Sequence, residues 1–340
     1  MPDVLAIGEA LIDLIDEGAA TALGAHESGS ADYRGADTAD EGGEGPTEIP
    51  GGSPANVALT VARLGHRVDL ETWIGDDARG RAILSNLADS GVRVTASSIG
   101  ADRTSVATAI VDDLGQATYR FDLDWSPVGP LPVPAGTRVV HVGSIAAVLD
   151  PGRAIVFDAV RRARGRALVT VDPNVRPSIV GSRQDYMAWI GPVLACADVI
   201  KVSDEDLDWM RGASSRAAVI HGWLADGVSL VVLTGGRDGA RAWALSGAEV
   251  HVPATPVDVV DTVGAGDSFM GGLIDALVRG DWDASALAGI GVDDLEGLVR
   301  RGCEVADVTV SREGANPPWL HEIGGVSADG TALPAGLAAQ

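Results

Sequence analysis

The sequence of 340 residues contains little cysteine and no long apolar run. Its two cysteines, Cys196 and Cys303, lie far apart and show no Cys-x-x-Cys or Cys/His spacing, which argues against a disulfide framework or a zinc site and predicts two buried thiols. No apolar stretch approaches the roughly 18 residues of a membrane span, and the first residues carry acids where a secretory signal carries basic side chains. We therefore expect a soluble, cytoplasmic protein without a membrane partner.

Positively charged side chains are also scarce. The formal net charge is −23, and Lys201 is the only lysine. Binding to nucleic acid needs clustered basic residues that displace counterions from phosphates. The one dense basic run, four arginines within residues 161–166, is typical of the solvated last turn of a helix. We therefore expect no nucleic-acid partner, and the acidity favours solubility without selecting a function.

Short β-branched runs alternate with amphipathic stretches of helix length through most of the chain. Strands are predicted near residues 4, 67, 138, 167, 198 and 228. Helices are predicted at 54–64, 77–90, 152–164, 183–195, 214–226, 265–279 and 284–302. In the first helix, Ser53 is a predicted N-cap, Pro54 suits the first helical position and Gly65 ends the helix. The alternation predicts an α/β fold with a mostly parallel sheet.

Three segments interrupt this alternation. Residues 104–123 alternate apolar and polar side chains around a polar turn, which predicts an antiparallel hairpin in a small second layer. Residues 18–48 are rich in Gly, Ala, Ser and acids and have hardly any large apolar group, so burial cannot offset the entropy of ordering and a mobile loop is predicted. Residues 324–340 have a similar composition and are predicted to form a flexible tail.

The segment DTVGAGDSFMGG, residues 261–272, has the features of an anion site. Gly264, Ala265 and Gly266 are small enough for backbone amides to approach an anion, and the predicted helix that follows directs its positive end to the same place. Asp267 stands among these donors, where a carboxylate beside phosphate is costly unless it accepts a proton from an attacking hydroxyl. The alternative is a glycine-rich helix start in which Asp267 only compensates the helix dipole.

A second segment, GGSPANVA at residues 51–58, lies at a predicted junction of strand and helix. Gly51 and Gly52 allow a ligand to lie against the backbone, and Asn56 offers donors and acceptors that match vicinal sugar hydroxyls. Asp13 can accept hydrogen bonds from the same hydroxyls if the first strand ends beside this turn. A purely structural turn is the alternative for each of these residues.

Two further segments follow predicted strands. In LTGGRDGARAW, the Thr234 hydroxyl and the exposed amides near Gly236 and Gly239 suit a nucleotide phosphate, and a plain hairpin turn is the alternative. In VDPNVRP, Arg176 lies just past a strand, at the edge where α/β sheets bind ligands. Arg176 either clamps a phosphoryl group or pairs with Asp172.

The order and spacing of these motifs are more specific than any one of them. The pairing of G-G-x-x-x-N with D-T-x-G-A-G-D about 210 residues later resembles the two signatures of the ribokinase-like (PfkB) carbohydrate kinases. PANVA, DPNVRP, KVSDED and SREGANPP look most like bacterial fructokinases. The resemblance implies a ribokinase-like three-layer α/β/α sandwich over residues 1–323, with a small β lid formed by about residues 14–50 and 104–123.

The resemblance also implies an activity. The family phosphorylates small sugars with ATP and Mg²⁺ and often needs K⁺, and fructose is the implied substrate here. The alternatives are a kinase for another small polyol, such as 2-keto-3-deoxygluconate, ribose or a nucleoside, and a sugar- or nucleotide-binding regulator without turnover. For catalysis, the resemblance implies that Asp267 is the general base, that Gly264, Ala265 and Gly266 form the anion hole, and that Arg176 contacts the phosphoryl group. For the substrates, it implies that the sugar is bound by Asp13, Gly51, Gly52 and Asn56, and that ATP is bound by Thr234, Gly236 and Gly239. K⁺ binding is implied for Asp261 together with carbonyls of the SREG loop, residues 311–314.

Two departures from the family pattern bear on these implications. Many relatives have an N-x-x-E motif that organises Mg²⁺ through water, whereas this chain has Ser203 and Asp206 at those positions. Asp206 is therefore the implied magnesium residue. The acidic segment at 18–48 is longer than a connection to a lid strand requires, so both a monomer and a homodimer stay open.

Overall fold

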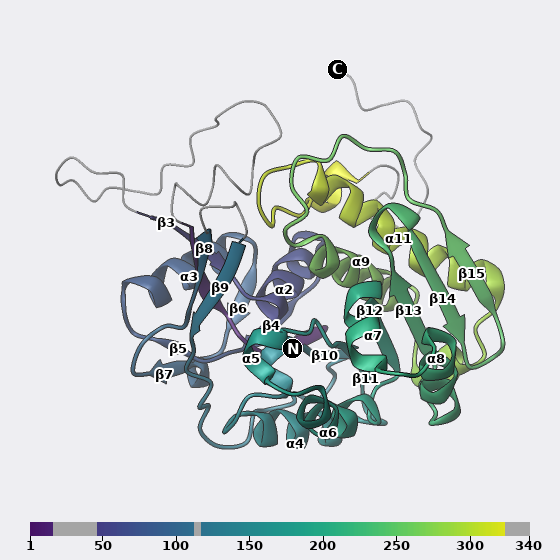
Figure 1. Cartoon of the computed structure of the whole chain (residues 1–340), viewed down its shortest axis with the longest axis horizontal. Helices are drawn as coiled ribbons and strands as arrows, with labels where there is room; N and C mark the ends of the chain where they lie inside the picture. Colours follow the sequence, from purple (N-terminus) through teal and green to yellow (C-terminus); the bar gives the residue numbers. More distant parts are fainter. Residues whose placement is uncertain (16–45, 112–116, 324–340) are drawn as a thin grey trace.

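The computed structural model describes residues 1–15, 46–111 and 117–323, and its central feature is a nine-stranded sheet (Figure 1). Across the sheet, the strands are β15 (Glu249–Val252), β14 (Ala240–Ala244), β13 (Leu230–Thr234), β12 (Val199–Ser203), β11 (Leu168–Asp172), β10 (Val139–Gly143), β1 (Val4–Ile7), β4 (Val68–Glu71) and β6 (Val92–Val94). The strands from β13 to β6 are parallel, whereas β14 pairs antiparallel with β13 and β15 pairs antiparallel with β14. Parallel strands are buried on both faces, which is why segments such as LVTVD in β11 are nearly continuous apolar runs.

Helices cover both faces of this sheet and bury two hydrophobic cores. One core includes α2 (Ser53–Arg63), α3 (Ala78–Asp89), α9 (Ala265–Arg279), α10 (Ala284–Ala288) and α11 (Val292–Val310). The other includes α4 (Arg153–Ala163), α5 (Pro177–Val180), α6 (Arg183–Leu194), α7 (Asp204–Arg211) and α8 (Arg216–Ala225). The expected three-layer α/β/α sandwich is therefore confirmed.

A second, four-stranded sheet lies at one end of the sandwich (Figure 1). Its strands, in order, are β3 (Thr47–Gly51), β2 (Leu11–Ile15), β8 (Val106–Val111) and β9 (Ala117–Asp122). β8 and β9 form the predicted antiparallel hairpin, and β3 leads directly into α2. The remaining short elements are β5 (Ile74–Gly75), which pairs with β7 (Ile99–Ala101), and the 3₁₀ turns η1 (Ala96–Ser98), η2 (Ser144–Ala147), η3 (Gly236–Asp238) and η4 (Leu320–Glu322).

Most predicted helices are present with small shifts at their ends, but some details were wrong. The single helix expected at 284–302 is two helices, α10 and α11, separated by a segment that contains Gly289 and Gly291, which disfavour a helix interior. Ser53 is the first residue of α2 and not its N-cap. Cys196 is buried as expected, whereas Cys303 is only half-buried.

Parts of two predicted segments lie outside the described residues. These are most of the loop predicted at 18–48 and the whole tail predicted at 324–340. Within the described part, Thr47 and Glu48 belong to β3, where a loop was expected. None of the helices in the described ranges is both long and apolar enough to cross a bilayer.

Candidate functional site

The candidate site lies at the carboxyl ends of the central parallel strands. β11 ends at Asp172, β12 at Ser203 and β13 at Thr234, and such ends meet along one edge of a parallel sheet. The N-terminus of α9 and the second sheet reach the same region. Asp267 on α9 lies close enough to Asp13 on β2 for its charge to contribute to the raised pKa of Asp13. Motifs that are far apart in the sequence therefore share one site.

Asp267 is the central side chain of this site. It lies in the first turn of α9 and is only 8% exposed. The Ser53 hydroxyl donates a hydrogen bond to Oδ1 at 2.6 Å, and the Asn56 amide donates one to Oδ2 at 2.9 Å. Burial raises the pKa of Asp267, and the hydrogen bonds from Ser53 and Asn56 oppose this effect. A buried, oriented carboxylate with a raised pKa suits the removal of a hydroxyl proton.

A close contact between α2 and α9 brings these residues together. A Cβ atom on Gly271 would lie only 2.4 Å from Cγ2 of Thr60, so glycine is needed for the two helices to pack at this separation. The contact allows Asn56 to reach Asp267 across 211 positions of sequence. The predicted sugar motif and the predicted anion motif thus meet directly.

The turn before α9 has the backbone of an anion site. Gly264 has a left-handed φ of 74°, and a Cβ atom there would lie 2.6 Å from a side chain of the loop after α11, so conformation and space both require glycine. The Ala265 amide donates to the Thr262 carbonyl at 3.2 Å. Within the described residues, the amides of Gly266 and Asp267 have no backbone acceptor, which leaves two donors for an anion at the helix N-terminus.

A buried cation lies beneath this turn. Lys201 on β12 is 3% exposed, and its Nζ donates to Oδ2 of Asp172 at 2.9 Å. A Cβ atom on Gly266 would lie 2.8 Å from the same Nζ, so the glycine leaves space for the ammonium group. Burial opposes the charge, but Asp172, and then the charges of Asp267 and Asp206, raise the pKa of Lys201. The ammonium group therefore stays protonated at neutral pH.

The predicted sugar-binding residues come from β2, β3 and α2. A Cβ atom on Gly51 would lie 2.1 Å from Oδ2 of Asp13. One on Gly52, whose φ is 105°, would lie 2.5 Å from the carbonyl oxygen of Glu9. Burial raises the pKa of Asp13 to about 6, against the opposing charge of Arg176. Gly51 therefore lets the Asp13 carboxylate lie directly against the strand-to-helix turn, and Gly52 lets the turn pass close to the backbone at Glu9.

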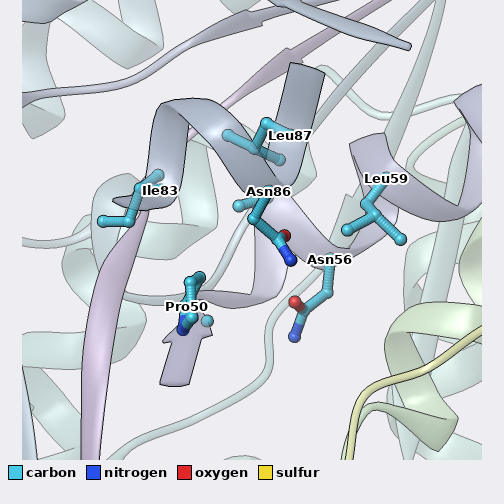
Figure 2. A pocket seen from close by; sticks show the side chains of 8 residues that line it. Pro50, Asn56, Leu59, Ile83, Asn86 and Leu87 are labelled. Carbon is cyan, nitrogen blue, oxygen red and sulfur yellow. The ribbon is translucent and has the colours of Figure 1, made fainter. Parts of the chain in front are cut away.

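A small hollow adjoins Asn56 (Figure 2). It is formed by β3, α2 and α3, and its lining residues are Pro50, Gly51, Ala55, Asn56, Leu59, Ile83, Asn86 and Leu87. Asn56 and Asn86 supply its polar side chains, and the rest of the lining is largely apolar. The side chain of Asn56 therefore takes part both in this hollow and in the hydrogen bond to Asp267.

Arg176 is exposed and does not pair with Asp172, so that alternative was wrong. Its guanidinium group donates to Oδ1 of Asn174 at 2.6 Å, whereas Asp172 is paired with Lys201. The reason is that a lysine on the neighbouring strand already occupies the buried side of Asp172. Arg176 lowers the pKa of Asp13, which places its charge on the predicted sugar side of the site.

Asp206 lies in the first turn of α7. The Asp206 amide donates to the Ser203 hydroxyl at 3.1 Å, so Ser203 is the N-cap of this helix. Oδ1 of Asp206 accepts from the Val175 amide at 3.0 Å. Burial raises the pKa of Asp206. In the described ranges, no group of three or more His, Cys, Asp or Glu side chains could hold a metal ion. A single carboxylate fits Mg²⁺ that is bound mainly by water and substrate phosphates.

The predicted nucleotide residues lie at the end of β13 and in the turn to β14. The Gly235 amide donates to the Gly239 carbonyl at 2.9 Å, so the hairpin turn is present. Gly236 and Gly239 have left-handed φ values of 52° and 78°. A Cβ atom on Gly239 would also lie 2.1 Å from the carbonyl oxygen of Val252. The turn therefore requires glycine for its backbone, and ATP binding by Thr234, Gly236 and Gly239 stays a prediction.

Asp261 joins the loop before α9 to the SREG loop, residues 311–314. Its Oδ1 accepts from the Val263 amide and its Oδ2 from the Gly314 amide, both at 2.9 Å. Oxygen ligands are the ones that hold K⁺ in proteins. Asp261 joins the two loops from which the expected cation site would be built, and K⁺ binding there stays a prediction.

Three residues of this region were not predicted to belong to the site. Ser53 was interpreted as a helix cap, Asn86 carries no local signal, and Lys201 was considered only for its effect on total charge. Lys201 did have a signal, since the only lysine of the chain interrupts the apolar strand DVIKV. A charge in a strand that is buried on both faces needs a partner, and such a partner indicates a site.

Comparison with known proteins identifies the family. Residues 1–322 match the sequence model of the pfkB family carbohydrate kinases. The chain belongs to this family. It is 32% identical over 321 residues to a fructokinase of Rhizobium leguminosarum bv. trifolii, covering 92% of this chain and 87% of that protein. It is 35% identical over 251 residues to an aminoimidazole riboside kinase of Salmonella typhimurium, covering 71% of this chain and 78% of that protein.

A solved structure agrees with this assignment. The crystal structure of a fructokinase double mutant from Vibrio cholerae O395, with fructose, ADP and a potassium ion bound, has a TM-score of 0.73 and 26% sequence identity. The match covers 93% of this chain and 94% of that chain. The expected family and the ribokinase-like fold are therefore confirmed, and this protein is a carbohydrate kinase.

Proposed function

We propose that this kinase transfers the γ-phosphoryl group of ATP to fructose, with Asp267 as the general base. The observation that carries the proposal is the buried Asp267 carboxylate, held by Ser53 and Asn56 at the N-terminus of an anion-binding helix. The fructokinase relative and the Vibrio cholerae structure with bound fructose support the choice of sugar. Both motifs of the sequence thereby act on one reacting hydroxyl.

The residues divide the reaction between them. Asp13, Gly51, Gly52 and Asn56 bind the sugar, and Thr234, Gly236 and Gly239 bind ATP. The sugar hydroxyl oxygen forms a bond to the γ-phosphorus, the bond from that phosphorus to the oxygen shared with the β-phosphate breaks, and ADP leaves with the electron pair. Asp267 takes the hydroxyl proton. The turn at Gly264, Ala265 and Gly266 presents the free amides of Gly266 and Asp267, which together with Arg176 stabilise charge on the moving phosphoryl group.

The chain also offers residues for the two expected cations. Asp206 is the residue for Mg²⁺, and Asp261 with carbonyls of the SREG loop is the site for K⁺. The cations would neutralise phosphate charge and order the anion-binding turn. The second sheet acts as the lid that excludes water when both substrates are bound.

The test is an ADP-release screen of the parent enzyme with fructose, ribose, 2-keto-3-deoxygluconate, aminoimidazole riboside and fructose 6-phosphate. We expect fructose to have the highest kcat/KM. The riboside is included because a relative of that activity is 35% identical. If another substrate has a tenfold higher kcat/KM, corresponding to about 1.4 kcal/mol of transition-state binding, the fructose assignment is wrong and the kinase assignment stands.

The general base is tested with Asp267→Asn. The amide is nearly the same size but cannot accept the hydroxyl proton, so kcat should fall by about 10²- to 10⁴-fold while KM for fructose changes little. Calorimetric titration with ATP should show that nucleotide affinity is kept. A variant that binds ATP normally and retains more than about a tenth of parental kcat would show that Asp267 is not the base, and Asp13 would then be the next candidate.

A further inference from the structure

The last residue of α2, Arg63, holds the chain segment that follows α11. Its Nη1 donates to Oδ1 of Asn316 and to the carbonyl oxygen of Pro317, each at 2.7 Å. The guanidinium carbon also lies 5.1 Å from the ring centroid of Trp319, which is a cation–π distance. Its Nε donates to the Ser90 hydroxyl, the residue that ends α3. One side chain therefore fastens residues 316–319 to the ends of two helices.

This contact continues by hydrogen bonds to the proposed cation site. The Asn316 amide donates to the Gly314 carbonyl at 2.8 Å, and the Gly314 amide donates to Oδ2 of Asp261 at 2.9 Å. Oδ1 of Asp261 accepts from the Val263 amide, immediately before Gly264. A chain of hydrogen bonds thus runs from Arg63 through the SREG loop to the anion-binding turn.

Close packing strengthens this path. A Cβ atom on Gly264 would lie 2.6 Å from Cβ and 2.9 Å from Cα of Ala315, so residue 315 fixes how near the loop can lie to the turn. Arg63 holds the next residue of that loop, Asn316. Displacement of Asn316 must therefore change the position of Ala315, Gly314 and the carboxylate of Asp261.

The opposite end of α2 holds the general base. Ser53 and Asn56 lie in the first turn of the helix, and Arg63 lies at its end, about 15 Å from Ser53 and about 10 Å from Asn56 along the axis. One helix thus carries the hydrogen-bond donors to Asp267 at one end and, at the other, Arg63, which binds the segment that follows the SREG loop. Its position sets both halves of the phosphoryl-transfer site.

We propose that Arg63 is a positioning residue that holds the SREG loop, through Asn316, in the geometry that binds the monovalent cation beside the phosphates. In this proposal Arg63 acts on the cation through the loop. The proposal rests on the proposed function, because the cation site is part of it. It assigns a role in the reaction to a residue outside both signature motifs.

The experiment compares Arg63→Met and Asn316→Leu with the parent enzyme. Cation binding is measured without turnover, as the rise in melting temperature when KCl replaces NaCl at constant ionic strength. We expect the K⁺ concentration for half of the maximal rise to increase at least about tenfold in each variant, as is typical when a group that orients metal ligands is lost. The double variant should show no more than the larger single effect, because the hydrogen bond from Arg63 to Asn316 is lost in both single variants.

Two controls separate positioning from a general loss of structure. Arg279→Met removes another arginine that holds the end of α2, through the Leu64 carbonyl at 2.7 Å. Among the residues that the structure describes, Arg279 makes no hydrogen bond to the SREG loop. It should melt earlier and keep its K⁺ response. Asn316→Asp keeps an acceptor for Arg63 and should stay within about threefold of the parent, since the hydrogen bond is preserved.

The outcomes are distinguishable. Equal shifts in Arg63→Met and Arg279→Met, additive shifts in the double variant, or a parent that does not respond to K⁺ would each overturn the inference. If Arg63→Met does not fold, Asn316→Leu decides the question from the other side of the same bond. A parent that responds to K⁺ but phosphorylates no sugar overturns the proposed function, and the thermal measurements still test Arg63.

Discussion

Lys201→Met is the substitution with the most informative expected effects, because it removes the only lysine from a buried ion pair. The side chains of Lys201 and Asp172 are 4% and 2% exposed, and the other oxygen of Asp172 is buried without a partner among the described residues. Removal of one member of a buried pair costs about 3–5 kcal/mol. At about 1.4 °C per kcal/mol for a chain of this length, the melting temperature should fall by about 5 °C.

The same change should alter the pH dependence of turnover. The charges that act on Asp267 come from Asp172 on β11, which raises its pKa, and from Lys201 on β12, which lowers it. Asp13 on β2 also faces Asp267, while Ser53 and Asn56 contribute only neutral hydrogen bonds. The base works as a carboxylate, so kcat rises with pH through the pKa of Asp267. Removal of the Lys201 charge raises this pKa, so the acid limb should move to higher pH.

The assay is a pH profile of kcat at saturating fructose and ATP, measured with coupled ADP release. Asp172→Asn should move the acid limb in the opposite direction, toward lower pH, because it removes a negative charge near Asp267. Arg301→Met is the matched control. Arg301 on α11 is 12% exposed and pairs with Asp275, which lies further along α9 than Asp267. It should lose stability without moving the limb. If the limbs of Lys201→Met and Asp172→Asn coincide with that of the parent, the electrostatic reasoning about Asp267 is wrong.

Two further predictions concern the packing of α9. Gly271→Ala should lower stability by about 1–3 kcal/mol and reduce kcat, because its Cβ atom would meet Thr60 at 2.4 Å and push α9 away from Asn56; unchanged melting and turnover would contradict this. Asp275 is fully buried, and although burial raises its pKa, His66, Arg301 and Arg279 lower it below the ordinary value of 3.8. Asp275→Asn should therefore lower the free energy of unfolding by about 3–5 kcal/mol at pH 7. In denaturant titrations, the difference between variant and parent should shrink as the pH falls through the lowered pKa of Asp275, because the parent carboxylate then becomes neutral as well.

The fold could be predicted because each layer has a local signal. The inner strands of the central sheet, such as β1, β10 and β11, are buried on both faces and appear as apolar runs. Helix α9 begins and ends where its pattern predicts, at Ala265–Arg279. The break between α10 and α11 was missed because a helical period continues across Gly289 and Gly291. The periodicity of apolar residues indicates which face of a helix is buried, but it does not indicate the residue at which the helix ends.

The site could be predicted only in part, for a different reason. Asp267 and Asn56 lie in motifs with recognisable backbone requirements, so their residue types and spacing were informative. The pairing of Lys201 with Asp172 depends on β11 and β12 being neighbours, and strand order is a tertiary property that no window of sequence contains. The interpretation of Ser53 as a cap failed in the same way, since the acceptor of its hydroxyl, Asp267, lies 214 residues away.

The burial of Lys201 has a consequence for the chemistry of the protein surface. Because the chain has no other lysine, a reagent that acylates amines can modify the folded protein only at its α-amino group, whatever the conformation of the rest of the chain. Modification of the ε-amino group requires the structure that covers Lys201, which includes the turn at Gly266, to open. Acylation of Lys201 therefore reports opening of the structure around this residue, and mass spectrometry can measure it at a single position.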